Sequence, residues 1–265
     1  MTKAELRERY AHLAKPAAHL RPAAASAFTQ LGGIPRLPED FVWPRYKGSP
    51  HAFLGQIDLA ELRGSLASFL PATGVLSFFY DEEQRAWGFD PDDRGGWLVH
   101  FHDGDLAALK SWTHRQDIPA YCFSKRKAVA PHRIETMPYF RAVLDTIPDW
   151  DRDGEAYLEL VRDVFVGLPE HQVLGHPDPV QEDTMERTCQ LASNGIYLGN
   201  PSGYHDRRRA DLESAAGDWK LLLQLDSDDE LGWLWGSGGK LYFWIRETDA
   251  KAGDFSRVWL ELQST

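Results

Sequence analysis

Two parts of the chain carry the same succession of apolar and polar positions. In the first part, Phe53–Asp58 is followed after a loop by Val75–Tyr80, and in the second part Leu221–Asp226 is followed by Lys240–Ile245. Each first segment is an apolar run that ends in Gln, an aliphatic residue and Asp. Each second segment is an aromatic run that begins after a glycine. Such runs are typical of buried strands, so the repetition predicts two similar β-rich halves.

Two further segments are predicted to be strands, Trp97–His102 and Arg257–Gln263. In the second of them, aliphatic residues alternate with Trp259, Glu261 and Gln263. A period of two places alternate side chains on opposite faces of a strand. The last strand is therefore expected to be half-buried.

Helical signals occur at the N-terminus and in the middle of the chain. Thr2 and Glu5 form a capping box ahead of a helix predicted over about 4–14. A proline at the first position starts a second predicted helix over 138–146. The remaining predictions are a helix around the apolar stripe of 157–165, a helix after Gln181 and a connector between the halves over Asp149–Gly154.

These elements predict an α+β fold that is sheet-rich and internally duplicated, with helices packed outside. We expect the whole chain, 1–265, to form one domain. Within it, the N-terminal helix lies in 1–15, the first half spans about 28–148 and the second half about 155–265.

The net charge of the chain limits the classes of partner that it is expected to bind. With 29 Lys and Arg against 40 Asp and Glu, the net charge is −11. Binding to nucleic acid or to an anionic membrane needs clustered basic residues, so neither is expected. An acidic surface suits solubility or a basic protein partner.

Cysteine usage and hydropathy indicate where the protein acts. The two cysteines, Cys122 and Cys189, have neither the spacing of a metal site nor that of a disulfide framework. The N-terminus is polar, and no apolar run reaches the ~18 residues of a membrane span. These features predict a cytoplasmic protein that holds no cofactor and no metal.

Several motifs together resemble the bacterial YwqG-like family. The resemblance begins at about Gln30, runs to the C-terminus and is collinear. It implies a sheet-rich α+β fold with internal duplication and a cytoplasmic location, and it brings no catalytic residue with it, because none is known for that family. Members are sometimes suggested to act as immunity-like binders near toxin systems. The matching strings are LGGxPxLP at 31–38, WP at 43–44, FLxQID at 53–58, LPxxGxLxFF at 70–79, HQxLGxP at 171–177, Gln181, LLQLDS at 222–227 and GxLxFxI at 239–245.

Three motifs that suggest chemistry are better explained by structure. The glycine run before Lys240 lacks the spacing and the following helix of a phosphate-binding loop. His100 and His102 share one face of a strand, but two histidines near loosely placed carboxylates commonly occur by chance. The acidic run 226–230 lacks the alternating ligands of a calcium loop, so we expect a solvated acidic loop there.

The remaining candidates are the polar residues of the repeated segments and two residues near the second one. An amide and a carboxylate two positions apart share one strand face, and both need partners when buried. They either satisfy the backbone of the Pro- and Gly-rich loops or line a polar pocket between the halves. The candidate ligand-binding residues are Gln56, Asp58, His171, Gln181, Gln224 and Asp226.

Two functional hypotheses follow. The first is a non-enzymatic binding protein, immunity-like in its most concrete form, that holds a basic protein partner or a small ligand. The alternative is a hydrolase-like or metal-dependent enzyme with His171, Gln181 and Asp226 in a cleft between the halves. An enzyme is expected to show several titratable groups converging in one pocket, with a strongly shifted pKa.

Overall fold

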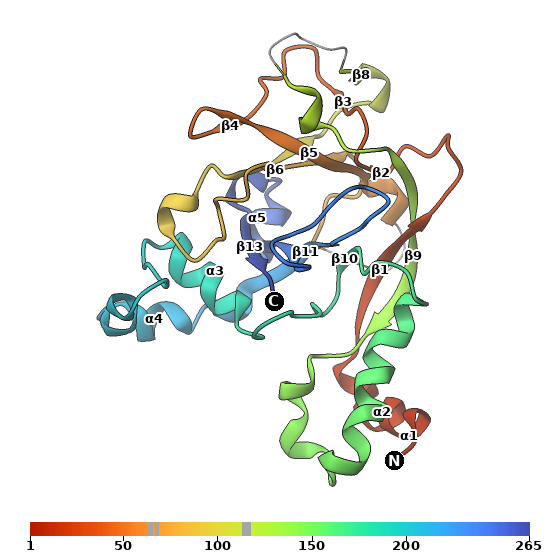
Figure 1. Cartoon of the computed structure of the whole chain (residues 1–265), viewed down its shortest axis with the longest axis vertical. Helices are drawn as coiled ribbons and strands as arrows, with labels where there is room; N and C mark the ends of the chain where they lie inside the picture. The colour runs from red at the N-terminus through yellow and green to blue at the C-terminus, as the bar shows by residue number, and fades with distance from the viewer. Residues whose placement is uncertain (63–65, 67–68, 113–117) are drawn as a thin grey trace.

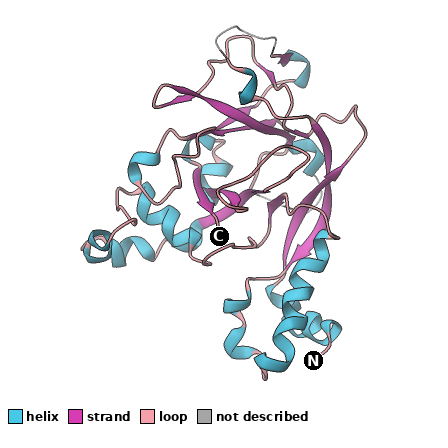
Figure 2. Ribbon diagram, viewed as in Figure 1, coloured by secondary structure: helices cyan, strands magenta, loops and turns pink. Residues whose placement is uncertain are grey.

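The computed structural model describes residues 1–62, 66, 69–112 and 118–265. Its main element is a large, nearly closed antiparallel sheet, around which five α-helices lie among these residues (Figures 1 and 2). The predicted sheet-rich α+β fold is confirmed. The strands, in their order across the sheet, are β13 (Trp259–Gln263), β12 (Lys240–Arg246), β11 (Trp219–Asp226), β10 (Gln172–Leu174), β1 (Lys15–Pro22), β9 (Lys127–Thr136), β2 (Gln30–Leu31), β5 (Ser49–Asp58), β6 (Val75–Asp81) and β7 (Trp97–His102).

Three short strands complete the pairing of the described residues. β4 (Arg45–Tyr46) pairs with the start of β5. β3 (Arg36–Leu37) and β8 (Lys110–Ser111) form a separate two-stranded sheet. All three belong to the loops that cover the first half of the chain.

The sheet has two wings on either side of the central pair β1–β9. We call β2, β5, β6 and β7 the N-terminal wing, and β10, β11, β12 and β13 the C-terminal wing. The pairing of β5 with β6 shifts register between Phe53 and Gly55, and that of β11 with β12 shifts between Leu221 and Leu223. A bulge of this kind bends a strand and increases its twist. Both wings therefore bend at matching places.

The wings face each other across a shared core. The rings of Phe78 in β6 and Phe243 in β12 lie 5.2 Å apart in an edge-to-face arrangement. The end strands also meet, because the rings of Trp97 and Trp259 are 5.0 Å apart and Trp97 Nε1 donates to the carbonyl of Val258. Aromatic pairs of this geometry add to the free energy of apolar burial. The contact at the ends brings the sheet close to closure.

The outer faces of the two wings have different covers. On the N-terminal wing, Phe53 and Phe79 lie under aromatic side chains of the loops, among them Phe41, Trp43 and Trp112. On the C-terminal wing, helix α3 (Met185–Ser193) packs against β11 and β13. Side chains of one strand alternate between the two faces of a sheet, so the same strands contribute to the shared core and to these outer layers.

Helices α1 (Lys3–Tyr10) and α2 (Trp150–Arg162) pack together beyond the central strands, at the lower end of Figure 1. The predicted capping box of Thr2 and Glu5 is present. The two other helices of the described chain, α4 (Arg209–Glu213) and α5 (Glu247–Lys251), are short. Within the described residues, no helix is long and apolar enough to cross a membrane.

Several predicted helix boundaries were wrong. The segment 138–146 contains two 3₁₀ turns, Phe140–Ala142 and Leu144–Thr146, instead of one helix. Asp149–Gly154 is not a connector, because Asp149 caps α2 and its side chain accepts a hydrogen bond from the Arg152 amide. An acidic residue at a helix start satisfies a backbone donor that has no partner within the helix. The N-terminal helix also ends earlier than expected, and β1 follows it.

Other predictions missed the role of tertiary contacts. β1 and β9 form the centre of the sheet although the sequence analysis predicted neither, because Pro16 and Pro131 lie within them and proline is uncommon in strands. β13 was expected to be half-buried, yet all five of its residues are buried. Its second face is covered by α3, which the sequence alone did not place there.

Candidate functional site

Gln56 of β5 holds a loop of the N-terminal wing. Its Oε1 accepts a hydrogen bond from the Arg36 amide at 2.7 Å, and its Nε2 donates to the Arg36 carbonyl at 2.6 Å and to Ser77 Oγ at 2.8 Å. The side chain is 1% exposed. A buried backbone group without a partner is costly, so this amide stabilises the loop after Pro35.

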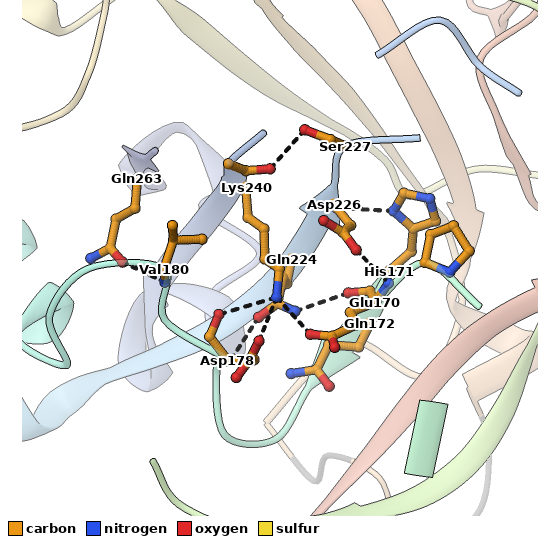
Figure 3. Close-up of polar contacts among 12 residues, drawn as sticks. Glu170, His171, Gln172, Asp178, Val180, Gln224, Asp226, Ser227, Lys240 and Gln263 are labelled. Atoms are coloured by element: carbon orange, nitrogen blue, oxygen red, sulfur yellow. Dashed lines mark hydrogen bonds and ion pairs between the residues drawn. The ribbon is translucent and has the colours of Figure 1, made fainter. Parts of the chain in front are cut away.

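Gln224 of β11 has the matching position in the C-terminal wing (Figure 3). Its Oε1 accepts from the Asp178 amide at 2.9 Å, and its Nε2 donates to the Glu170 carbonyl at 2.9 Å. Asp178 follows Pro177 just as Arg36 follows Pro35. The two glutamines thus make similar contacts on two separate loops.

The two aspartates of the repeated segments also bind backbone. Asp58 Oδ1 accepts from the Ala60 amide at 2.9 Å, and Asp226 Oδ2 accepts from the Glu170 amide at 3.0 Å. Among the described residues, Gln56 and Asp58 share no hydrogen-bond partner with Gln224 and Asp226. The structure thus brings His171, Gln224 and Asp226 together, while Gln56 and Asp58 lie in the other wing.

His171 is buried, and both of its ring nitrogens are engaged. Nδ1 accepts from the Asp226 amide at 3.1 Å, which leaves Nε2 as the nitrogen that donates to Asp228 Oδ2 at 3.1 Å. Asp228 also accepts from Lys127 Nζ at 2.8 Å. Burial alone raises the pKa of Asp228, but the hydrogen bonds from His171 and Lys127 outweigh it and hold the pKa below its usual value. His171 therefore fixes the loop after β11.

Lys240 joins two carboxylates beside Gln224 (Figure 3). Its Nζ lies 2.6 Å from Glu170 Oε2 and 2.5 Å from Asp178 Oδ2. Burial raises the pKa of Glu170 to about 7, with Asp178 adding to the shift and Lys240 opposing it. Burial alone raises the pKa of Asp178, but Lys240 and Glu170 outweigh it and lower that pKa. A buried cation needs such partners, so this cluster fixes both loops to β12.

Gln181 lies at the far end of the same loop. Gln263 Oε1 of β13 accepts from the amides of Val180 and Gln181 at 3.1 and 3.0 Å, and Gln181 Nε2 donates to the Ser264 carbonyl at 2.7 Å. The loop from Asp178 to Gln181 is therefore held at one end by Gln224 and at the other by Gln263. Gln181 also lines a cavity.

This cavity, which we call the Glu261 pocket, has a volume of about 380 Å³. It lies beside β13, between α3, α4 and a segment of the first half that runs along β13, where the Leu262 amide donates to the Trp87 carbonyl. Its apolar wall consists of Trp87, Phe89, Leu191, Leu198 and Leu262. Its polar lining includes Gln181, Glu182, Thr184, Arg187, Thr188, Tyr204, Arg209 and Glu261.

Glu261 is the buried acid of this pocket, with 8% of its surface exposed. Its Oε1 accepts from Gln263 Nε2 at 2.8 Å, whereas no described residue donates to its buried Oε2. The neighbouring Thr188 hydroxyl donates to the Thr184 carbonyl at 3.2 Å and also lies close enough to Glu261 to lower the pKa of that carboxyl. Burial raises the pKa of Glu261 to about 7 against the opposing effects of Gln263 and Thr188. A buried acceptor without a donor is costly and marks a site where a ligand group or a proton is favoured.

Arg209 supplies a buried donor to the same pocket. Its Nε donates to Glu213 Oε1 at 2.8 Å, and its guanidinium lies 4.7 Å from the ring centre of Tyr204. Its Nη1 is buried and has no hydrogen-bond partner among the described residues. Arg187 Nε lies 3.9 Å from the same carboxylate oxygen of Glu213. Two arginines therefore share one carboxylate, and Nη1 of Arg209 remains as a donor without a partner among the described residues.

Sequence reasoning identified only part of this site. Gln181 is the one predicted residue found in the lining of the Glu261 pocket. Glu261 appeared in the alternation of the last strand, where a carboxylate among mostly apolar residues was a usable signal. Because one face of this strand was expected to be exposed, Glu261 was not predicted as a site residue. Arg209 is the last of three consecutive arginines, a run that is typical of exposed segments, but its side chain is only 17% exposed.

The structure also places the motifs that were set aside. His100 packs against the ring of Phe41 at 5.0 Å, whereas His102 Nε2 lies 3.2 Å from the Asp105 carbonyl. Across residues 1–62, 66, 69–112 and 118–265, no group of three or more His, Cys, Asp or Glu residues is arranged to hold a metal ion. The glycine run before Lys240 leads into β12 and not into a helix.

Two comparisons with known proteins complete the description. A family model described as "Domain of unknown function (DUF1963)" matches residues 29–264. A search of curated proteins found no match. The matched range begins just before β2 and includes both wings and the Glu261 pocket.

Proposed function

The chain belongs to the DUF1963 family, and from that premise we propose that it is a binding protein that holds a small polar molecule in the Glu261 pocket. The observation that carries this proposal is that Glu261 lines a cavity of about 380 Å³ and that its buried Oε2 has no hydrogen-bond partner among the described residues. Small-molecule sites combine apolar walls with a few oriented polar groups. This pocket has that composition.

The hydrogen bonds made by the other candidate residues favour binding over catalysis. Both nitrogens of His171 hold loop groups, and the amide of Gln224 is engaged at both ends. An enzyme with a cleft needs several such groups free to converge on a substrate. The raised pKa of Glu261 suits a general acid or base. Turnover of a bound compound that is lost in Glu261→Gln would favour the enzyme hypothesis.

A basic protein partner is the other form of the binding hypothesis. It rests on the loop after β11, where Asp229 and Glu230 are exposed. The neighbouring Asp228 adds little charge to this surface, since it is 4% exposed and bonded to Lys127 and His171. We therefore rank this surface below the pocket.

Origin and location are part of the proposal. The matching bulges and the matching loop contacts of Gln56 and Gln224 support an internal duplication that produced the two wings. The shared motifs support a YwqG-like assignment within the family. The polar N-terminus and the unpaired cysteines support a cytoplasmic protein.

A thermal-shift screen of the full chain against a metabolite collection tests the binding proposal. Leu198→Trp would fill the pocket without removing Glu261, and Leu168→Trp is the matched control, because Leu168 is 36% exposed and lies outside the pocket lining. A ligand at 100 times its Kd raises stability by about 2.7 kcal/mol. Compounds that stabilise the wild type and Leu168→Trp but not Leu198→Trp are the expected result. Equal stabilisation of both variants, or no stabilising compound, contradicts the proposal.

A further inference from the structure

Two residues that line the Glu261 pocket each carry a buried polar atom that has no hydrogen-bond partner among the described residues. One is an acceptor, Glu261 Oε2, and the other is a donor, Arg209 Nη1. We infer that the ligand is a free amino acid with an apolar side chain, whose ammonium group pairs with Glu261 and whose carboxylate pairs with Arg209. This inference rests on the proposed function and names the class of its ligand.

The Glu261 end favours a cation. Gln263 Nε2 already occupies Oε1 of the carboxylate, so one oxygen remains for a second donor. The lining around Glu261 also contains apolar residues such as Leu191. Attraction between opposite charges is stronger away from water. An ammonium group would both donate to Oε2 and restore the charged form of the acid.

The Arg209 end favours an anion. Glu213 is shared between Arg209 Nε at 2.8 Å and Arg187 Nε at 3.9 Å, so one carboxylate faces two guanidinium groups. Stacking over Tyr204 holds the plane of Arg209. A guanidinium presents its donors in a fixed fork that matches a carboxylate. Nη1 is a buried donor of that fork that has no partner among the described residues.

The remaining wall indicates the side chain of the ligand. Trp87 and Phe89 contribute two rings with centroids 6.4 Å apart, and Leu198 and Leu262 complete an apolar surface. Apolar contact stabilises by roughly 25 cal/mol per Å² removed from water. A branched or aromatic side chain would use this surface, whereas a charged side chain would lose hydration there.

Calorimetric titration of the full chain with L-leucine and L-phenylalanine tests the inference. Two analogues each lack one charge: isoamylamine has no carboxylate and 4-methylpentanoate has no ammonium group. We expect at least one of the amino acids to bind, and each analogue of leucine to bind at least tenfold more weakly than leucine. Glu261→Gln and Arg209→Gln should each weaken amino-acid binding at least tenfold.

Arg207→Gln is the control for Arg209→Gln, because Arg207 is exposed two positions away and does not line the pocket. It should bind like the wild type, and melting curves should show that every variant is folded. A second readout is proton release on binding near pH 7, measured in buffers of different ionisation heat, which Glu261→Gln should abolish.

The outcomes separate this inference from the proposed function. If other compounds bind in a manner that Leu198→Trp blocks, but neither amino acid does, the ligand class is wrong and the pocket proposal stands. Equal binding of 4-methylpentanoate and leucine would also overturn the ligand class. If leucine or phenylalanine binds equally well to Leu198→Trp, both proposals are wrong.

Discussion

The outer faces of the two wings start from the same strand geometry and end in different interiors. In the N-terminal wing, Phe79 contacts Phe41 at 5.4 Å and Trp43 at 5.2 Å between ring centres, so aromatic rings fill the space over β6. A cavity of about 360 Å³ lies at the β2 edge of this wing. In the C-terminal wing, α3 covers the sheet and leaves the Glu261 pocket beside β13. The two similar sheets therefore have different cavities beside them because different segments cover them.

The contrast extends to single positions. Ser77 of β6 pairs with His100 of β7, and the matching Tyr242 of β12 pairs with Glu261 of β13. His100 and Glu261 thus occupy equivalent sites in the two wings. Burial lowers the pKa of His100 and raises the pKa of Glu261, because in both cases it disfavours the charged form. Equivalent positions therefore carry opposite responses to pH.

The largest expected effect concerns the filled face. Trp43→Ala should lower the free energy of unfolding by about 4 kcal/mol, because it leaves a cavity among packed rings. Leu198→Ala, in the wall of the open face, should cost at most about 2 kcal/mol, because that side chain already borders empty space. Urea denaturation of both variants measures the difference. Equal losses would show that the two faces are packed alike.

The next effect is the pH dependence of the equivalent positions. The folded-state pKa of Glu261, about 7, lies above the ordinary value of 4.5, so its favourable contribution is complete below pH 4.5 and is lost as the pH rises through 7. Glu261→Gln does not titrate, and its stability relative to the wild type should increase by about 3 kcal/mol between pH 4 and pH 8.

His100→Gln is the matched test in the other wing. The pKa of His100 is lowered from 6.5, so the wild type loses stability as the pH falls below 6.5, and the variant should gain relative stability in acid. Urea denaturation of the wild type and both variants at pH 4 and pH 8 measures these changes. If both variants gain relative stability in the same pH direction, the comparison is wrong.

The smallest effect concerns the feature that the wings share. Gln56→Leu and Gln224→Leu should each cost about 2 kcal/mol, because each leaves loop backbone groups without their partner. The two losses should add in the double variant, since the glutamines contact different loops. Denaturant titration of the two single variants and the double variant measures this. A clear departure from additivity would indicate that the two loops are coupled.

The sequence predicted the strands of the repeated segments well because their patterns are local. β5, β6, β11 and β12 appear where apolar runs indicated them. The side chains of Gln56 and Gln224 are buried and bind backbone groups of the loops, which is one of the two interpretations given for them. β1 and β9 were missed because their strand character comes from pairing with each other and with the wings. A proline-containing segment gives little local signal for such pairing.

The candidate site was harder to predict than the fold. Gln181 was a predicted site residue and lines the pocket, but Glu261 and Arg209 were not predicted as site residues. Whether a carboxylate on a strand faces water or a cavity depends on the element that packs over it, and here that element is α3, some 70 positions earlier in the chain. No pattern within β13 encodes that contact.

The sequence by itself determined the alternation of strand faces, the ends of the repeated strands and the amides that hold their loops, because neighbouring residues set these features. Only the tertiary structure decided that one outer face is filled by aromatic rings and the other contains a pocket with a buried acid. That difference depends on which distant segments cover each wing, and burial, pKa and open space are properties of such long-range contacts.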